Sequence, residues 1–139
     1  MEGLSQLKLQ TDNNDIILTK PFNRYSHALY ENQPWPIYTW DSTGYISAYT
    51  SRQTFFTAEW MMRQLHLPTE DRLKEVEAFF DEALPSETKK KFIKDNQITF
   101  LYLHNEELGE NLSSILIDLG FKEIFSNREV TIFRVENQI

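Results

Sequence analysis

Short apolar runs alternate with helical patterns along this chain, and the alternation limits the possible folds more strongly than any other feature. The runs have the length and the β-branched or aromatic content of strands, and they occupy residues 16–19, 54–57 and 98–103. Apolar side chains at helical spacing occupy residues 59–65, 69–83 and 86–95, and a last helix begins at about Glu107 or Glu110 and ends at Leu119. Strands that alternate with helices form right-handed crossovers, so we expect the strands to lie largely parallel in one sheet.

The two ends of the chain add elements of a different kind. Leu4, Leu7 and Leu9 indicate a short amphipathic helix ahead of the first strand. Residues 121–125 and 130–135 fit two strands joined by a tight turn, which together form an antiparallel hairpin. We therefore predict an α/β fold: a small three-layer Rossmann-like domain with a mostly parallel sheet and a C-terminal antiparallel hairpin.

Local signals mark where the helices begin and end. Thr69 and Ser86 follow prolines and can cap the helices that start there, and Gly120 ends the last helix in the left-handed position. Residues 46–49 fit either a helix or a strand. The three consecutive lysines at residues 89–91 predict a solvated helix face, with contact to phosphate or a lipid headgroup as the alternative.

Composition excludes several classes of protein. We expect residues 1–139 to form a single soluble α/β domain, in which residues 1–14 are a lead-in. The net charge of −7 argues against nucleic-acid binding, because neutralising phosphates needs a basic face. Without cysteine, disulfides, thiol nucleophiles and cysteine-based zinc sites are excluded. No apolar run approaches the ~20 residues of a membrane span, and residues 1–11 lack the order of a signal peptide.

The residue pattern contains no complete catalytic or metal site. His27, His66 and His104 have no partner at metal-ligand spacing, so we interpret each as a surface or hydrogen-bonded residue. A phosphate-cradling loop is nearly excluded because the chain has only four glycines. Acidic pairs such as Glu106 and Glu107 fall at turns or helix starts, where negative charge stabilises the helix end. We therefore predict no catalytic residue, no metal ligand and no cofactor.

A long aromatic loop region, residues 21–53, holds the most unusual stretch of the chain. In residues 32–41, Pro34 and Pro36 stiffen the chain, and Trp35, Tyr38 and Trp40 lie beside Asp41. Aromatic faces next to polar side chains suit a sugar site, where rings stack and polar groups give direction. The same combination suits a membrane-interface belt. A third and plainer interpretation is that the rings fasten the loop onto the core, and all three stay open.

Ordered segments through most of the chain resemble a known family. They are residues 15–19 (Asp-Ile-Ile-Leu-Thr), 45–55 (Tyr-Ile-Ser-Ala-Tyr-Thr-Ser-Arg-Gln-Thr-Phe), Arg72, Val76, Phe79 and Phe80, and residues 92–102, 124–125 and 132–135. Together they resemble the soluble C-terminal, extracytoplasmic domain of bacterial multi-pass membrane proteins of the glycosyltransferase-C type (dolichyl-phosphate-mannose-mannosyltransferase-like) and their uncharacterised relatives. The resemblance covers residues 12–135. One departure falls in the family's Ile-Ser-x-x-Thr-Gly-Arg pattern, where Ser51 replaces the usual glycine before Arg52.

The resemblance implies that catalysis takes place outside this domain. In such enzymes the catalytic acid lies in loops near the membrane surface, and the polyprenyl-phosphate sugar donor binds between membrane helices. The soluble domain covers the active site or contacts the glycan acceptor on the extracytoplasmic face of the membrane. Its partners would be the transmembrane part of its own parent chain and a glycan or lipid-linked sugar.

On this hypothesis the candidate binding residues lie in the aromatic loop region and the segment that follows it. They are Trp35, Tyr38, Trp40, Asp41, Tyr45 and Arg52. The rings would stack on a glycan or lie at the membrane interface. Arg52 would bind a carboxylate or a phosphate, or would anchor the loop.

Two rival hypotheses belong to other classes. Because the chain begins with Met1 and has no span, a free-standing cytoplasmic α/β protein that binds a ligand or a partner is the main alternative. Residues 119–121, Leu-Gly-Phe, are similar to the end of GNAT acetyltransferases, which would indicate a divergent small-molecule transferase. We reject that reading, because residues 104–107 are acidic and free of glycine and would repel a pyrophosphate.

Overall fold

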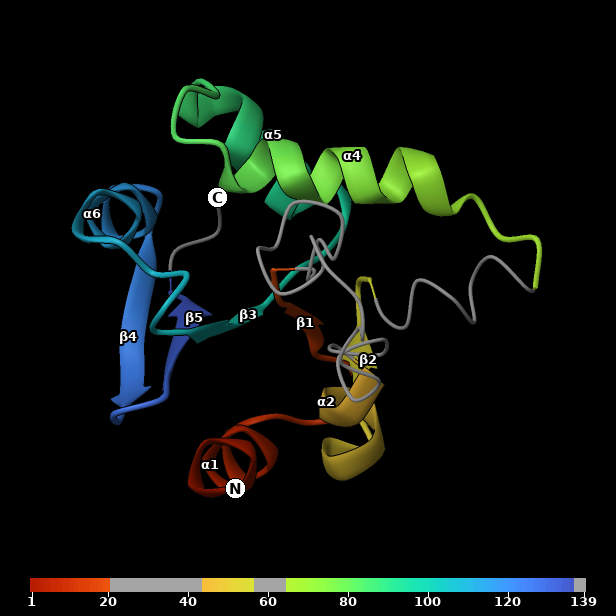
Figure 1. Cartoon of the computed structure of the whole chain (residues 1–139), viewed down its shortest axis with the longest axis vertical. Helices are drawn as coiled ribbons and strands as arrows, with labels where there is room; N and C mark the ends of the chain where they lie inside the picture. Colours follow the sequence, from red (N-terminus) through yellow and green to blue (C-terminus); the bar gives the residue numbers. More distant parts are fainter. Residues whose placement is uncertain (21–43, 57–64, 137–139) are drawn as a thin grey trace, which may run out of the picture.

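The computed structural model describes residues 1–20, 44–56 and 65–136 (Figure 1). Its elements in chain order are α1 (Glu2–Gln10), β1 (Ile16–Leu18), α2 (Gly44–Thr50), β2 (Gln53–Thr54), α4 (Thr69–Phe80), α5 (Ser86–Asp95), β3 (Phe100–His104), α6 (Glu110–Asp118), β4 (Phe121–Ser126) and β5 (Val130–Val135). These helices and strands confirm the α/β class. Nearly all of the helix predicted at residues 59–65 lies outside the described residues.

The five strands form one mixed sheet in the order β2-β1-β3-β5-β4. β1 lies between β2 and β3 and is parallel to both. β5 pairs antiparallel with β3 on one side and with β4 on the other, which confirms the predicted C-terminal hairpin. The sheet is therefore parallel in its first part and antiparallel beyond β3.

Helices cover both faces of this sheet. Along β3, side chains alternate between the faces: Phe100 and Tyr102 pack with α1 and α2, whereas Leu101 and Leu103 pack with α4, α5 and α6. Figure 1 shows α1 and α2 together on one side of the strands, with α4 and α5 on the other. The two hydrophobic clusters therefore lie on opposite faces of the sheet.

α1 confirms the predicted amphipathic helix at the start of the chain. Leu4 and Leu7 are buried, but Leu9 is 77% exposed. Leu9 lies two positions beyond Leu7, about 200° around the helix, so it faces solvent and the prediction that included it is wrong. A side-chain carbon at Gly3 would overlap the Val130 side chain, so α1 packs tightly against β5.

The predicted helix caps at Thr69 and Ser86 are wrong. These residues are the first of α4 and α5, and neither side chain makes a capping hydrogen bond. Pro68 and Pro85 occupy the cap positions, where a proline offers no side-chain acceptor. Thr69 Oγ1 instead donates to the Leu67 carbonyl at 3.1 Å. Both helices keep an acidic residue in the first turn, which stabilises the positive end of the dipole.

α4 is shorter than the helix predicted at residues 69–83. The backbone turns extended at Asp81, and the Asp81 carboxylate accepts the Ala83 N–H at 2.9 Å. Ala83 therefore lies in the turn to α5 and takes no part in the apolar stripe. The buried stripe consists of Val76, Phe79 and Phe80.

Lys89 corrects the prediction of a solvated lysine run, because its side chain is 1% exposed. Lys89 Nζ donates to the carbonyl of Phe79 and, at 2.5 Å, to that of Asp81. The ammonium lies 5.4 Å from the centre of the Phe79 ring. Burial lowers the pKa of Lys89, and the nearby acidic side chains oppose that shift. The lysine thus satisfies carbonyls at the negative end of α4, where a cation is favoured.

The remaining element predictions agree with the structure apart from their boundaries. Residues 46–49, for which the sequence allowed a helix or a strand, lie in the helix α2. β2 is only two residues long, and Phe55 adds one more N–H bond to the Ile17 carbonyl at 2.9 Å. Gly120 has φ 97° just after α6, which confirms the left-handed helix end.

Replacing Lys89 with methionine should lower the free energy of unfolding by about 2 kcal/mol, because the buried Phe79 carbonyl loses its donor. The Asp81 carbonyl keeps the Leu84 N–H at 3.2 Å. Urea unfolding followed by circular dichroism measures the change. Lys91→Met is the matched control: Lys91 is on the same helix, is exposed and pairs with Asp95 at 2.7 Å, so about 0.5 kcal/mol or less is expected. Equal losses for the two variants would contradict the capping role of Lys89.

Candidate functional site

The carboxyl ends of β1 and β3 form a topological switch point. From β1 the chain passes to β2 on one side, and it then returns to β3 on the other side of β1. In open α/β sheets, ligands bind outside the carboxyl ends of adjacent strands whose connections leave in opposite directions. β3 also continues beyond Leu101, its last partner in β1, to His104. This edge of the sheet is therefore the first candidate for a functional site.

Three rings meet at this edge. Tyr45, in the first turn of α2, has its hydroxyl 2.7 Å from His104 Nε2. The Tyr102 ring packs edge-on against both, with its centroid 6.5 Å from that of Tyr45 and 6.0 Å from that of His104. Burial, followed by the neighbouring Tyr102 and Glu107, raises the pKa of Tyr45, so its hydroxyl stays protonated. The hydroxyl can therefore donate to His104 or to a ligand.

Glu107 adds an unusual carboxyl group to these rings. It lies in the turn after β3, where its N–H donates to the His104 carbonyl at 2.9 Å. Its Oε2 atom is buried and has no hydrogen-bond partner among the described residues. Burial raises the pKa of Glu107 to about 7, and the Lys20 ammonium partly opposes this shift. An unpartnered buried acceptor costs about 1–3 kcal/mol, so it calls for a specific explanation such as a ligand, a water or strain.

Asn105 holds the turn that carries Glu107. Its N–H donates to the Glu129 carbonyl at 2.8 Å, and its side-chain amide donates to the Asn127 carbonyl at 2.7 Å. The Asn105 Oδ1 atom accepts the Thr131 hydroxyl at 2.8 Å. The turn is thereby fastened to the β4–β5 hairpin, which fixes Glu107 relative to the rings.

We call Tyr45, Tyr102, His104 and Glu107 the switch-point cluster. It offers hydroxyl, imidazole and carboxyl groups from α2, β3 and the following turn, all suited to hydrogen bonding. None of these side chains is an activated nucleophile, and within residues 1–20, 44–56 and 65–136 no group of three His, Asp or Glu could hold a metal ion. Hydrogen bonding to a ligand is one chemistry that these groups can perform.

Of the two sequence-predicted binding residues that the structure describes, Tyr45 and Arg52, Tyr45 lies in this cluster. The pattern analysis missed Tyr102 and Glu107, and it treated His104 as an isolated residue. A usable signal existed: His104 lies two positions after Tyr102 in a strand, so both side chains point to one face. Trp35, Tyr38, Trp40 and Asp41 lie outside the described residues.

Arg52 lies at the opposite end of the sheet from Tyr45. Its Nη2 atom donates to the Thr11 carbonyl at 2.9 Å, and its Nη1 atom donates to Asn13 Oδ1 at 2.9 Å. Its Nε atom donates to Thr11 Oγ1 at 3.2 Å. These bonds tie the segment after α2 to the segment that precedes β1. Through them Arg52 anchors its own segment to Thr11 and Asn13.

Ser51, just before Arg52, has φ 57°, the left-handed conformation that favours glycine. The preceding residue, Thr50, is fully buried, and its hydroxyl donates to the Ile46 carbonyl at 2.7 Å. The same oxygen accepts the Arg52 N–H at 3.2 Å. The chain therefore makes the turn that a glycine would make, with serine in its place.

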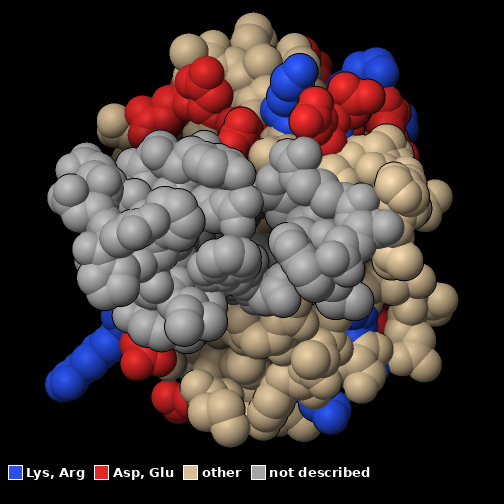
Figure 2. Space-filling model, turned by 45° about the vertical axis from the view of Figure 1, so that its right-hand side comes forward, with Lys and Arg blue, Asp and Glu red and all other residues tan. Residues whose placement is uncertain are grey.

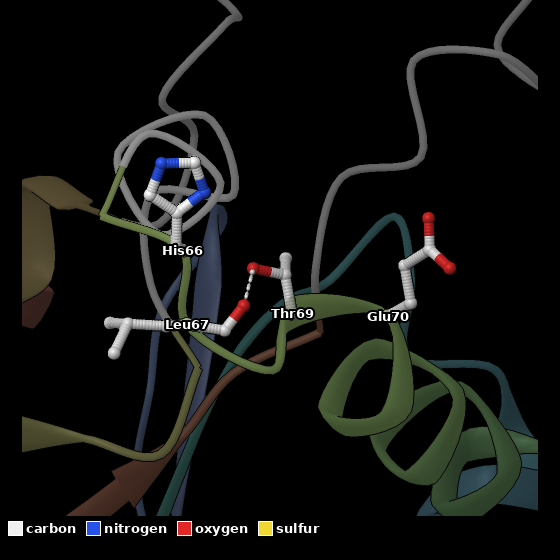
Figure 3. A pocket seen from close by; sticks show the side chains of 4 residues that line it. All are labelled: His66, Leu67, Thr69 and Glu70. Atoms are coloured by element: carbon white, nitrogen blue, oxygen red, sulfur yellow. Dashed lines mark hydrogen bonds between the residues drawn. The ribbon is translucent and has the colours of Figure 1, made fainter.

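A separate hollow of about 340 Å³ lies at the start of α4 and is lined by His66, Leu67, Thr69 and Glu70. Figure 3 shows His66 and Glu70 on either side of Thr69, with both side chains extending to the same side of the chain. The bond from Thr69 to the Leu67 carbonyl is internal to the lining. This hollow is a weaker candidate than the switch-point cluster, where Tyr45 and His104 are hydrogen-bonded to each other.

Surface charge is mixed on the face drawn in Figure 2. Acidic and basic side chains gather side by side at its upper end, which corresponds to the α4–α5 side of Figure 1. That distribution agrees with the net charge of −7 and does not favour a phosphate backbone. None of the helices in the described part of the chain has the length and apolar character needed to cross a membrane.

Replacing Ser51 with glycine should raise the free energy of unfolding by about 0.5–1 kcal/mol, because glycine removes the cost of φ 57°. Thermal unfolding of the variant measures the effect. Ser114→Gly, on the exposed face of α6, is the matched control and should lower stability by about 0.5 kcal/mol. If Ser51→Gly is the less stable of the two, the left-handed turn is not present in solution.

Replacing Glu107 with glutamine should change how stability depends on pH. The pKa of Glu107 is about 7 when folded against 4.5 as its ordinary value, so the wild type loses stability as pH rises between these values. After allowance for partial exposure, the variant should be more stable by about 1–2 kcal/mol near pH 8 and equal near pH 4. Urea unfolding across this range measures the difference. Glu106→Gln is the control: it removes only the smallest contribution to the raised pKa of Glu107, so it should keep most of the wild-type pH dependence. A Glu107→Gln variant that also keeps it would contradict the burial of this carboxyl.

Comparison with known proteins adds no relative. No family model matches this chain, and no curated protein matches it at a significant level.

Proposed function

We propose that this chain is a non-catalytic accessory domain of a multi-pass membrane glycosyltransferase-like protein, on the extracytoplasmic face of the membrane. There it covers the active site or contacts the glycan acceptor. The observation that carries the proposal is the left-handed backbone at Ser51. The family pattern Ile-Ser-x-x-Thr-Gly-Arg has glycine at this position, and this chain keeps the backbone that such a glycine would adopt.

The other residues of that pattern also have specific contacts. Ser47 Oγ lies 2.9 Å from Thr54 Oγ1, which joins α2 to β2. Thr50 is buried and bonds both to α2 and to the turn, and Arg52 bonds to Thr11. Each of these polar residues of the pattern therefore makes a specific contact in this chain. The contacts therefore support the resemblance where it is most specific.

The chemistry of the switch-point cluster supports a binding role within that protein. In the proposed arrangement, Tyr45 and the loop residues Trp35, Tyr38, Trp40 and Asp41 contact a glycan or the membrane interface. Arg52 anchors the fold. Catalysis is supplied by the transmembrane part of the parent chain, which also binds the lipid-linked sugar.

The finer fold assignment belongs to the same proposal. A three-layer Rossmann-like domain has helices on both faces of its sheet and a switch point between its central strands. The order β2-β1-β3 and the two hydrophobic clusters support that assignment. The antiparallel β5–β4 pair distinguishes this chain from a fully parallel doubly wound sheet.

A free-standing cytoplasmic ligand-binding protein is the second candidate. One observation favours it: Tyr45, Tyr102, His104 and Glu107 form a cluster that needs no second chain. The two candidates differ in where the protein resides, so localisation separates them.

In cells of its source, an epitope-tagged chromosomal copy should be found in the membrane fraction and should be digested by protease added outside intact spheroplasts. The coding frame upstream should encode several apolar segments of ~20 residues. A cytoplasmic protein of the same cells is the control and should stay protected. Recovery of the tagged protein in the soluble cytoplasmic fraction would reject the proposal and favour the second candidate.

Replacing Trp35 and Trp40 together with alanine should reduce association with glycan arrays or lipid vesicles several-fold, since each ring contributes stacking or interfacial contact. The circular dichroism spectrum should stay unchanged. Ile117→Ala removes an apolar side chain that is 57% exposed on α6, so it controls for nonspecific adhesion. Unfolding of the double variant would instead show that the rings fasten the loop onto the core.

A further inference from the structure

The buried, unpartnered Oε2 atom of Glu107 is the feature that the fold leaves unexplained. Native proteins rarely bury an acceptor without a donor, and the exceptions cluster where a ligand, a water or chemistry accounts for them. This acceptor lies just beyond the carboxyl end of β3, at the switch point where α/β sheets place ligands. Two independent features, one atomic and one topological, therefore indicate the same place.

Charges around Glu107 nearly balance. The Lys20 ammonium, which follows β1, favours the ionised carboxylate, and Glu106 disfavours it. Tyr45 from α2 and His104 from β3 complete the polar surroundings. Lys20 and Glu106 offset each other, and burial disfavours a charge on Glu107 itself. The site therefore favours a neutral ligand that carries hydrogen-bond donors.

The neighbouring groups extend the same preference. Tyr45 and His104 share one hydrogen bond at 2.7 Å, so each keeps capacity to bond a further group. A hydroxyl group can donate and accept at once. One ligand hydroxyl can therefore donate to Glu107 while it accepts from Tyr45, and a second can reach the exposed His104 ring.

We infer that Glu107, Tyr45 and His104 form a binding site for a neutral, hydroxyl-rich ligand of the sugar or polyol class, with a ligand hydroxyl donating to Glu107 Oε2. The inference rests on the proposed function in that it names the ligand class of the same site. It adds His104 and Glu107 to Tyr45, which the sequence had already indicated as a candidate binding residue. The raised pKa of Glu107 agrees with the burial of this carboxyl, which disfavours its charged form.

Three sugars that share the same ring but are neutral, anionic and cationic test the ligand class. Methyl glucoside, glucuronate and glucosamine are titrated in turn into the ¹⁵N-labelled chain, in the millimolar range where single-sugar sites bind. The neutral sugar should shift the backbone amide signals of Tyr45, His104 and Glu107, and each charged sugar should bind several-fold more weakly. Tighter binding of a charged sugar, or no response to any of the three, would overturn the inference.

Variants of the same chain test the contacts. Glu107→Leu removes the acceptor and should weaken methyl glucoside binding about tenfold, whereas Glu107→Gln keeps an acceptor oxygen and should stay within a few-fold of wild type. Tyr45→Phe keeps the ring and should lose several-fold. Glu106→Gln, one residue away and exposed, should bind as wild type does. Unchanged binding by Glu107→Leu, with its spectrum still dispersed, would contradict the proposed contact.

The two levels of the proposal fail separately. Sugar binding that depends on Glu107 in a protein recovered from the cytoplasm would keep this inference and reject the membrane assignment. The protein could instead be attached to the membrane and accessible to protease, while its Glu107 amide signal does not shift with any of the three sugars. That result would keep the membrane assignment and reject this inference.

Discussion

The pairing of β3 on both of its edges is the constraint on which the rest of the structure depends. β3 joins β1 in a parallel ladder and β5 in an antiparallel one, so it connects the two parts of the sheet. Its alternating side chains supply both hydrophobic clusters. A slip of one residue would send Tyr102 and His104 to the α4–α6 face and remove them from Tyr45. The register of this strand therefore sets the core and the candidate site together.

Polar side chains hold the connections that the sheet leaves free. Lys89 closes the end of α4, Arg52 ties the turn after α2 to the segment before β1, and Asn105 fastens the turn after β3 to the hairpin. Each one donates to a backbone carbonyl outside the sheet. These bonds fasten turns in the described part of the chain. The exception is Glu107, whose buried oxygen has no such partner in the described residues.

The sequence predicted what depends on local periodicity and little of what depends on distant contacts. The strand before α2, the strand before α6, the terminal hairpin and the left-handed Gly120 could all be read from residues close in the chain. Lys89 could not, because only the packing of α5 on the end of α4 makes a lysine a buried donor. The Tyr45–His104 bond joins residues 59 positions apart, and its prediction needed the strand order as well as the pattern. Applied to that strand order, the right-handed crossover rule places the start of α2 near the carboxyl end of β3. The prediction lacked this step.

Photo-crosslinking from position 45 in living cells tests the central claim most directly, because Tyr45 lies in the switch-point cluster and in the segment of closest family resemblance. A benzophenone amino acid replaces Tyr45 in the chromosomal protein, with Ser114 on the exposed face of α6 as the control position. The account predicts that light produces adducts with a lipid-linked sugar, a glycan or the transmembrane part of the same protein from position 45, and few from position 114. Adducts with cytoplasmic proteins, or equal yields from the two positions, would contradict it.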